Sequence, residues 1–230
     1  MDKKTPSLAE TKANEIIKYI IDHKMMPGDK LPTEAAFLTI LNISRSTLRE
    51  AFKLLTARNI LEVRQGSGTF VSPKRGIPDD PLGLTFIYDD NQLVLDMLDV
   101  RLMFEPVVAS LAAANATEPQ LAEIAAQAKE MEHCIQEGRS YAAADSRFHR
   151  LVAEASGNRV IGNLTYILNS SVAKNIEVTM DAQRESNTIH YHRQILKALR
   201  ERNVKDAHHA MTMHLSLLRD FIMNKINENN

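Results

Sequence analysis

Two short β-rich runs around a glycine-rich turn are the most restrictive feature of this 230-residue sequence. The runs span residues 60–64 and 69–71, and the turn between them is Gln-Gly-Ser-Gly. This composition predicts an antiparallel hairpin. Because the rest of the sequence carries helical patterns, the hairpin must complete a unit whose other elements are helices.

Three helices are predicted before the hairpin, and each is marked by a side chain that can cap its first turn. Ser7 begins the first helix in a capping box, Thr33 begins a short second helix, and Ser44 begins the third. The residues of the second and third helices that we expect to face inward are Phe37, Ile40, Leu41, Leu48, Ala51, Phe52 and Leu55. Three helices followed by a hairpin is the order of a winged helix-turn-helix.

The third predicted helix begins with side chains that suit contacts to DNA. Arg45 and Arg49 can donate hydrogen bonds to guanine edges or phosphates, and the hydroxyls beside them can bond phosphates at the positive end of the helix. The turn at Gly66 has no bulky side chain, so its backbone can approach a groove. A capped surface helix with two exposed arginines is the alternative, and these side chains alone leave both open. The candidate DNA-binding residues are Ser44, Arg45, Ser46, Thr47, Arg49 and Gly66.

Charge is divided unevenly along the chain, although its net value is −1. Residues 1–75 hold 13 Lys and Arg against 8 Asp and Glu, whereas the remaining residues hold 15 against 21. The first segment is therefore the one suited to a polyanion. The single cysteine excludes an internal disulfide framework, and neither a signal peptide nor an apolar run of about 18 residues is recognisable. We therefore expect a cytoplasmic protein with no membrane association.

The sequence after residue 91 predicts a bundle of antiparallel helices. Apolar residues there recur at helical spacing, and breaks such as Asn203 are typical of turns between such helices. We expect a mainly α fold, with a winged helix-turn-helix at residues 1–73, a linker at 74–91 and an all-helical domain at 92–230. The predicted helices of this domain span residues 92–115, 118–137, 140–156, 158–181, 184–202 and 204–226.

Four residues of the helical domain have a spacing that suits a metal site. Asp145 and His149 are four residues apart, which places them on one helix face about 6 Å from each other. His192 and His214 lie 11 residues before and after Asn203. If Asn203 is the turn of a helical hairpin, both histidines stand roughly 16 Å from it and level with each other. Three imidazoles and one carboxylate inside a bundle suit a divalent transition metal, Zn²⁺, Ni²⁺ or Mn²⁺.

This spacing by itself leaves the metal site open. A histidine on a helix is more often a surface residue, or a core residue with a satisfied hydrogen bond, than a metal ligand. Cys134 is expected to be a small buried apolar residue. The histidines that we expect at the surface are His23, His133, His190, His208 and His209.

The first domain closely resembles the GntR family of regulators. The resemblance is carried by residues 27–34, 44–51 and 66–71. It implies that Arg45, Arg49 and Gly66 contact DNA, with the neighbouring hydroxyls assisting, and that the protein is a homodimer on a pseudo-palindromic operator. The sequence departs from the family at Ala35, where such proteins usually carry an arginine that contacts phosphate. We therefore expect one backbone contact fewer per subunit and a shallower salt dependence of binding.

The helical domain is similar to the FCD domain of the FadR-type subfamily. The similarity is carried by residues 98–105, 145–149, 192–196 and 214–215. In metal-binding members the ligands fall at four positions that this chain keeps, Asp145, His149, His192 and His214. The resemblance also implies that Arg101 faces the pocket, where it would hold a carboxylate effector together with the metal. The alternative for Arg101 is a surface salt bridge with Glu105, four residues on.

We therefore expect a DNA-binding repressor or activator, not an enzyme. Its operator affinity would be controlled by a small organic acid, such as a sugar acid or a hydroxy acid, bound at the metal. One alternative is a metal-free regulator of the acyl-CoA-sensing type. Another is a metal-dependent hydrolase, because three histidines and an aspartate can support a hydrolytic site, although no obvious general base accompanies them.

Overall fold

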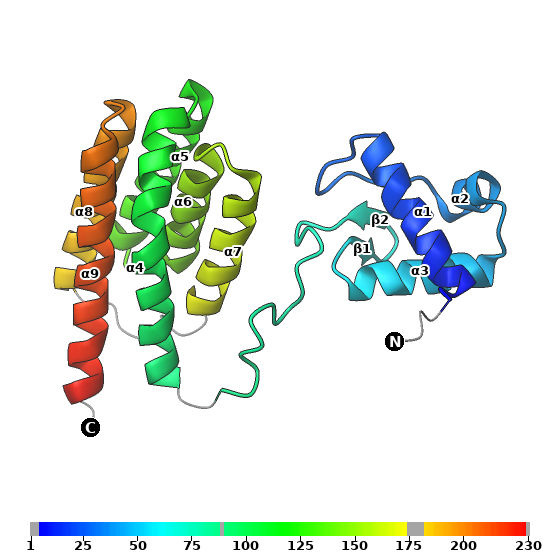
Figure 1. Cartoon of the computed structure of the whole chain (residues 1–230), viewed down its shortest axis with the longest axis horizontal. Helices are drawn as coiled ribbons and strands as arrows, with labels where there is room; N and C mark the ends of the chain where they lie inside the picture. The colour runs from blue at the N-terminus through cyan, green and yellow to red at the C-terminus, as the bar shows by residue number, and fades with distance from the viewer. Residues whose placement is uncertain (1–4, 88–89, 174–181, 229–230) are drawn as a thin grey trace. The chain divides into compact units, whose positions relative to one another are not determined.

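The structure is a computed structural model that describes residues 5–87, 90–173 and 182–228. It divides into two compact units, Met1–Leu84 and Thr85–Asn230. Helices dominate both units, and a two-stranded sheet lies in the first (Figure 1). The mainly α fold class predicted from the sequence is confirmed. Within the described ranges, no helix combines the length and the hydropathy needed to span a bilayer.

The first unit is a winged helix-turn-helix. Its elements are α1 (Leu8–Asp22), α2 (Glu34–Leu41), α3 (Arg45–Ala57), β1 (Leu61–Arg64) and β2 (Gly68–Val71). The two strands pair antiparallel, with Leu61 opposite Val71. A further bridge between Lys30 and Phe70 attaches the loop before α2 to the hairpin.

Capping side chains begin the three helices of the winged unit as the sequence predicted. Ser7, Thr33 and Ser44 each accept a hydrogen bond from a backbone N–H in the first turn of the helix that follows. Between α2 and α3 the chain reverses at Asn42, whose φ of 48° is left-handed. The largest fully buried side chains of this unit are Ile16, Phe37, Leu48, Leu55 and Leu61.

One predicted core position of the winged unit is wrong. Ile40 is 49% exposed, whereas Phe37 and Leu41 are buried. Leu38 packs against this core instead. The inward side of α2 therefore runs through Phe37, Leu38 and Leu41, and at 3.6 residues per turn Ile40 falls beyond the edge of that arc.

The second unit is a helical bundle. Its elements are α4 (Asp90–Asn115), α5 (Glu118–Gln136), α6 (Ala142–Ala155), α7 (Arg159–Ala173), α8 (Ala182–Arg200) and α9 (Val204–Glu228). The predicted and observed ends agree within about two residues wherever both fall in described parts of the chain. The C-terminal end of the helix predicted at 158–181 lies outside the described residues beyond Ala173.

Helix α4 is central to the bundle, because it packs against α6, α7, α8 and α9. Ala109, Ala112 and Ala113 on this helix are completely buried, and their short side chains allow neighbouring helices to approach closely. The bundle also encloses charged and polar side chains, which are rarely buried without a partner or a ligand. The buried ones that matter for the site are Arg101, Glu105, His149, His192 and His214.

Candidate metal centre and DNA-binding surface

The bundle brings the four predicted ligands together from three helices. Asp145 and His149 lie on α6, His192 on α8 and His214 on α9. Each offers one ligand atom, and these four atoms all lie within 4.8 Å of one another. Nε2 of His192 is 3.2 Å from Oδ1 of Asp145, and Nε2 of His149 is 3.8 Å from the same oxygen. Metal–ligand bonds of about 2.0–2.2 Å place neighbouring ligand atoms about 3–3.5 Å apart. His192 and Asp145 already have this spacing, and the other ligand atoms would have to move inward to hold an ion.

The three imidazoles are buried, and their inward nitrogens have no hydrogen-bond partner. The exposed fractions of His149, His192 and His214 are 1%, 1% and 5%. Among residues 5–87, 90–173 and 182–228, no group hydrogen-bonds the buried Nε2 of any of the three rings. Such orphaned nitrogens are costly and rare in protein interiors. A divalent cation bound among them would satisfy all three, and the donor set of three histidines and one aspartate suits such an ion.

Contacts on the far side of two rings orient their free nitrogens toward the centre. Nδ1 of His192 is 2.7 Å from the carbonyl oxygen of Thr188, to which it donates a hydrogen bond. This bond assigns the proton to Nδ1 and leaves the lone pair of Nε2 for a ligand. Nδ1 of His149 is 2.6 Å from Oε2 of Glu105, although the ring N–H is not aimed squarely at that oxygen.

Arg101 and Glu105 form an ion pair inside the bundle, not at its surface. Nε of Arg101 is 2.6 Å from Oε1 of Glu105, and the side chains are only 3% and 2% exposed. The alternative for Arg101 was a salt bridge with Glu105 at the surface. The partner is the predicted one, but the prediction of a surface position is wrong, because the pair is buried. The sequence did not predict the contact between Glu105 and His149. Spacing along one helix places Glu105 beside Arg101, but it says nothing of contacts between residues of α4 and α6.

The pKa shifts of His214 and Asp145 favour the protonation states that metal binding requires at these two residues. Burial, followed by the charges of His192 and His149, holds the pKa of His214 well below its usual value, which keeps this imidazole neutral. Loss of water raises the pKa of Asp145, but the nearby imidazoles of His149 and His192 outweigh it, and the net pKa is lowered. Asp145 keeps 22% of its side chain exposed, so solvent weakens that effect. A neutral imidazole and an ionised carboxylate are the forms that bind metals.

The other histidines and the cysteine lie where they were expected. Cys134 is 4% exposed and has no disulfide partner. The histidines that lie at the surface are His23, His133, His190, His208 and His209.

In the winged unit, the start of α3 presents the predicted DNA-binding side chains to solvent. Ser44 caps the helix, and its hydroxyl is 2.9 Å from the hydroxyls of Ser46 and Thr47. Arg45 and Arg49 are exposed, and neither forms an ion pair within the part of the chain that the structure describes. Both guanidinium groups are therefore available to an external anion.

A groove of about 540 Å³ extends this surface from α3 to the wing. Arg49, Lys53 and Thr56 line one side of it, and Val63 and Thr69 line the other. Lys53 and Thr69 were not predicted as part of this surface, although Lys53 follows Arg49 by one helical turn and therefore shares its face.

The tip of the wing depends on glycine. Gly66 has a φ of 72°, a left-handed conformation that side chains rarely adopt, and apart from its two chain neighbours no described residue comes within 4 Å of the position of a Cβ. The turn is thus open to solvent, as an approach to a groove requires.

A winged helix-turn-helix with unpaired arginines at the start of its third helix defines the class of DNA-binding transcription regulators. The family model for bacterial regulatory proteins of the gntR family matches residues 8–71, and the model for the FCD domain matches residues 96–217. The chain therefore belongs to the GntR family and carries an FCD domain. The family resemblance seen in the sequence is confirmed.

Relatives match along nearly the whole chain. The chain is 31% identical to the galactonate operon transcriptional repressor of Escherichia coli strain K12, across 88% of this chain and 91% of that protein. It is 27% identical to the uncharacterized HTH-type transcriptional regulator YcbG of Bacillus subtilis strain 168, across 96% and 93%. A solved GntR structure from Streptococcus agalactiae is 36% identical, with a TM-score of 0.78 over 92% of this chain and 99% of that one.

Proposed function

We propose that this transcription regulator binds a small organic acid at a divalent metal ion in its helical domain, and that the acid changes its affinity for operator DNA. The observation that carries the proposal is the set of three buried imidazole nitrogens without hydrogen-bond partners, gathered around Asp145. The ion would be Zn²⁺, Ni²⁺ or Mn²⁺. When bound, it would supply a Lewis acid that accepts the carboxylate oxygens of the effector.

A sugar acid is the effector class that the relatives favour. The Escherichia coli relative is named for a galactonate operon, and galactonate is a sugar acid. Arg101 is the cation that would bind the carboxylate of such a ligand. Its charge interacts with that of the candidate metal ligand Asp145, so the guanidinium lies close to the proposed site. Glu105 engages Nε and Nη2 of the guanidinium. The N–H groups of Nη1 remain for the carboxylate of an effector.

At the other end of the chain, the start of α3 would read operator DNA. Arg45 and Arg49 would contact base edges or phosphates, Ser44, Ser46 and Thr47 would contact phosphates, and the backbone at Gly66 would approach an adjacent groove. The exposure of these side chains and the left-handed turn of the wing support these roles.

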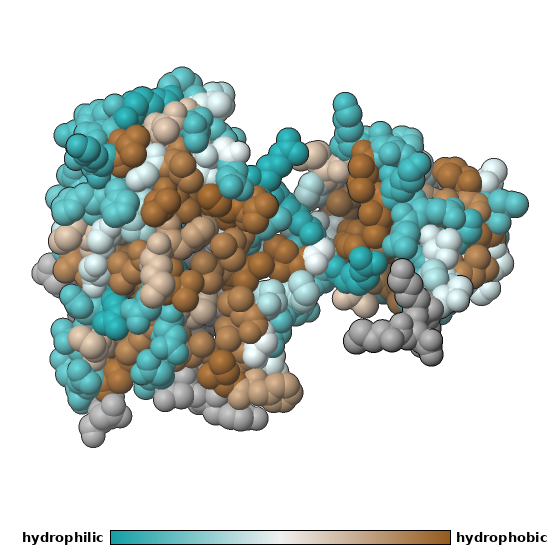
Figure 2. Space-filling view, in the orientation of Figure 1, coloured by the Kyte–Doolittle hydropathy of each residue, from teal (hydrophilic) through white to brown (hydrophobic). Residues whose placement is uncertain are grey.

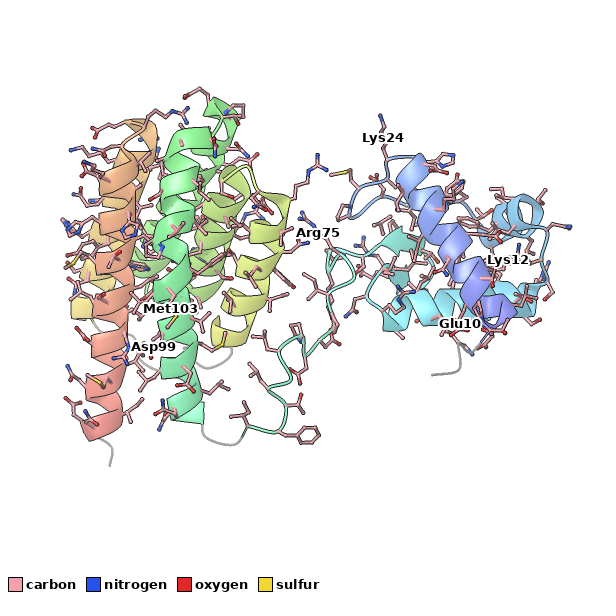
Figure 3. All side chains as sticks on the ribbon, viewed as in Figure 1. Glu10, Lys12, Lys24, Arg75, Asp99 and Met103 are labelled. Atoms are coloured by element: carbon pink, nitrogen blue, oxygen red, sulfur yellow. The ribbon has the colours of Figure 1, made fainter. Side chains whose placement is uncertain are left out.

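A second copy of the chain is the partner that the outer face of α4 favours. An apolar stripe runs along α4 and continues onto α7 (Figure 2), and Met103, at its centre, is 79% exposed (Figure 3). The residues of this stripe are Val100, Met103, Val107, Leu111, Val160 and Leu164. Exposed apolar patches of this kind mark interaction surfaces. A symmetric dimer would cover the stripe and would match a pseudo-palindromic operator.

Helix α4 would connect the effector to the dimer. Its inner face carries Arg101 and Glu105, whereas its outer face carries the stripe. Asp99, labelled in Figure 3, lies on the same helix. It ties α4 to α9, because its Oδ1 is 2.5 Å from Nε of Arg219. A ligand that moves Arg101 would therefore shift the element that sets the geometry of the dimer.

The experiment is a titration of operator DNA with the metal-loaded protein, followed by fluorescence anisotropy. The operator is first identified from the DNA fragments that the protein retains. Galactonate, other sugar acids and hydroxy acids are then tested one by one for an effect on binding to it. We expect one acid to change the operator affinity, and a chelator to abolish that change. An undiminished response in the chelated protein would overturn the role of the metal. A response to acyl-CoA or turnover of an acid would instead favour the metal-free regulator or the hydrolase.

A further inference from the structure

We propose that Glu105 is a positioning residue that holds a metal ligand, His149, and the effector-facing Arg101 in one buried network. The proposal rests on the metal site of the proposed function. It adds a physical link between the ion and the arginine, because one carboxylate serves both.

The distances and the burial of the three side chains support this network. One oxygen of Glu105 is 2.6 Å from Nδ1 of His149, and the other is 2.6 Å from Nε of Arg101. The exposed fractions of Arg101, Glu105 and His149 are 2%, 1% and 1%. A buried carboxylate between a guanidinium and an imidazole is thus the nearest anion to both of them.

The position of Glu105 behind Nδ1 of His149 favours Nε2 as the nitrogen that faces the ion, although Nδ1 is not aimed squarely at the carboxylate. A carboxylate at Nδ1 favours the tautomer with its proton there, which leaves the lone pair on Nε2. Nε2 is the atom that faces Asp145, at 3.8 Å. Carboxylates behind ligating histidines orient the ring and increase its basicity, and their loss typically weakens metal binding by about 10–100-fold.

The contact with Arg101 fixes the direction of the guanidinium. Glu105 engages Nε and Nη2, with Nη2 to oxygen at 3.4 Å. One edge of the planar group is thereby held, and the Nη1 side remains for a ligand. A single change at Glu105 should therefore disturb both the ion and the carboxylate pocket.

The test compares Zn²⁺ affinity and the His149 tautomer in four full-length proteins. These are the wild type, Glu105→Gln, the double variant Arg101→Gln/Glu105→Gln and the control Glu132→Gln. The double variant removes both charges of the pair and leaves no buried charge unpartnered, so it carries the test if Glu105→Gln does not fold. Glu132 is the control, since it also forms a bidentate pair with an arginine, Arg193, at 2.8 and 2.6 Å, but is not one of the four candidate ligands.

We expect a loss of Zn²⁺ affinity of about 10–100-fold in both Glu105 variants and no change in the control. In the metal-free protein, ¹⁵N NMR of the imidazoles should show His149 protonated at Nδ1 in the wild type and a shift toward the Nε2 tautomer in the variants. Wild-type affinity together with an unchanged tautomer in a folded Glu105 variant overturns the role of Glu105 and leaves the metal site intact. Failure of the wild type to bind Zn²⁺ overturns the metal site and this proposal with it.

Discussion

The two units of this protein place their candidate functional side chains in opposite environments. In the winged unit, Arg45 and Arg49 are exposed, and the helix behind them is held by apolar residues such as Leu48 and Leu55. In the bundle, His149 and His192 are buried among the core residues themselves. Exposed charges contribute little to stability, so the proposed DNA-binding surface can change without unfolding the unit. The Nε2 atoms of the two histidines have no hydrogen-bond partner among the described residues, so an ion bound there, as we propose, would make function and stability of the bundle depend on each other.

The largest effect predicted by this comparison is the loss of metal binding in His192→Ala. Removal of one of four ligands should lower Zn²⁺ affinity by more than about 100-fold, since loss of a group behind a ligand already costs about 10–100-fold. Saturating Zn²⁺ should then no longer raise the melting temperature of the bundle. Isothermal titration and thermal melts measure both. His190→Ala is the control, because His190 lies on the same helix but at the surface; equal losses in both variants would contradict the assignment.

A smaller effect is expected from Arg49→Ala, and it should fall on DNA alone. Loss of a base or phosphate contact costs about 1–3 kcal/mol, which is a roughly 5–150-fold loss of operator affinity. The melting temperature should stay constant, because Arg49 has no ion-pair partner among the described residues. Arg58→Ala removes the same charge at the opposite end of α3 and serves as the control. An Arg49 variant that unfolds at a lower temperature would break the contrast between the two units.

The two units should also respond differently to acid. Burial lowers the pKa of His214 in the folded protein, so the unfolded state binds more protons as the pH falls below about 6.5. The stability that this group contributes to the metal-free bundle is therefore complete above that pH and is lost below it, by at most about 1.4 kcal/mol per pH unit. Melts of the metal-free protein between about pH 8 and pH 5 measure this loss. A His214→Gln variant with an equally steep pH dependence would show that another group is responsible.

The smallest effect is expected from Ala35→Arg. Ala35 is exposed at the start of α2, where family members usually carry an arginine. One added phosphate contact should strengthen operator binding modestly and steepen the slope of log affinity against log salt by about 0.9 per subunit. Anisotropy titrations between about 50 and 200 mM salt give the slope. An unchanged slope would place this position away from the phosphates.

The sequence predicted local features well and contacts between distant helices less completely. Ser7, Thr33 and Ser44 cap their helices as expected, because a cap depends on residues three positions away. His192 and His214 could be placed level, since one turn at Asn203 joins their helices. The inward position predicted for Ile40 was wrong. A helix of eight residues shows too little periodicity to define its buried face, which is set by the elements that pack against it.

The contact between Glu105 and His149 is a feature that the sequence could not predict. His149 lies 44 residues further along than Glu105, on a helix that two intervening turns separate from α4. No local periodicity sets the register between such helices, which depends on how their side chains interlock. The i, i+4 spacing to Arg101 was visible, but the burial of the pair was not.

The central claim is that the buried histidines form a metal centre, and equilibrium binding of Zn²⁺ tests it most directly. In a calorimetric titration of protein prepared without a metal-affinity column and stripped by a chelator, we predict one ion bound per chain. The same titration of a folded His149→Ala/His192→Ala variant should give no binding at this site. A stripped, folded wild type that binds no Zn²⁺, Ni²⁺ or Mn²⁺ would contradict the account.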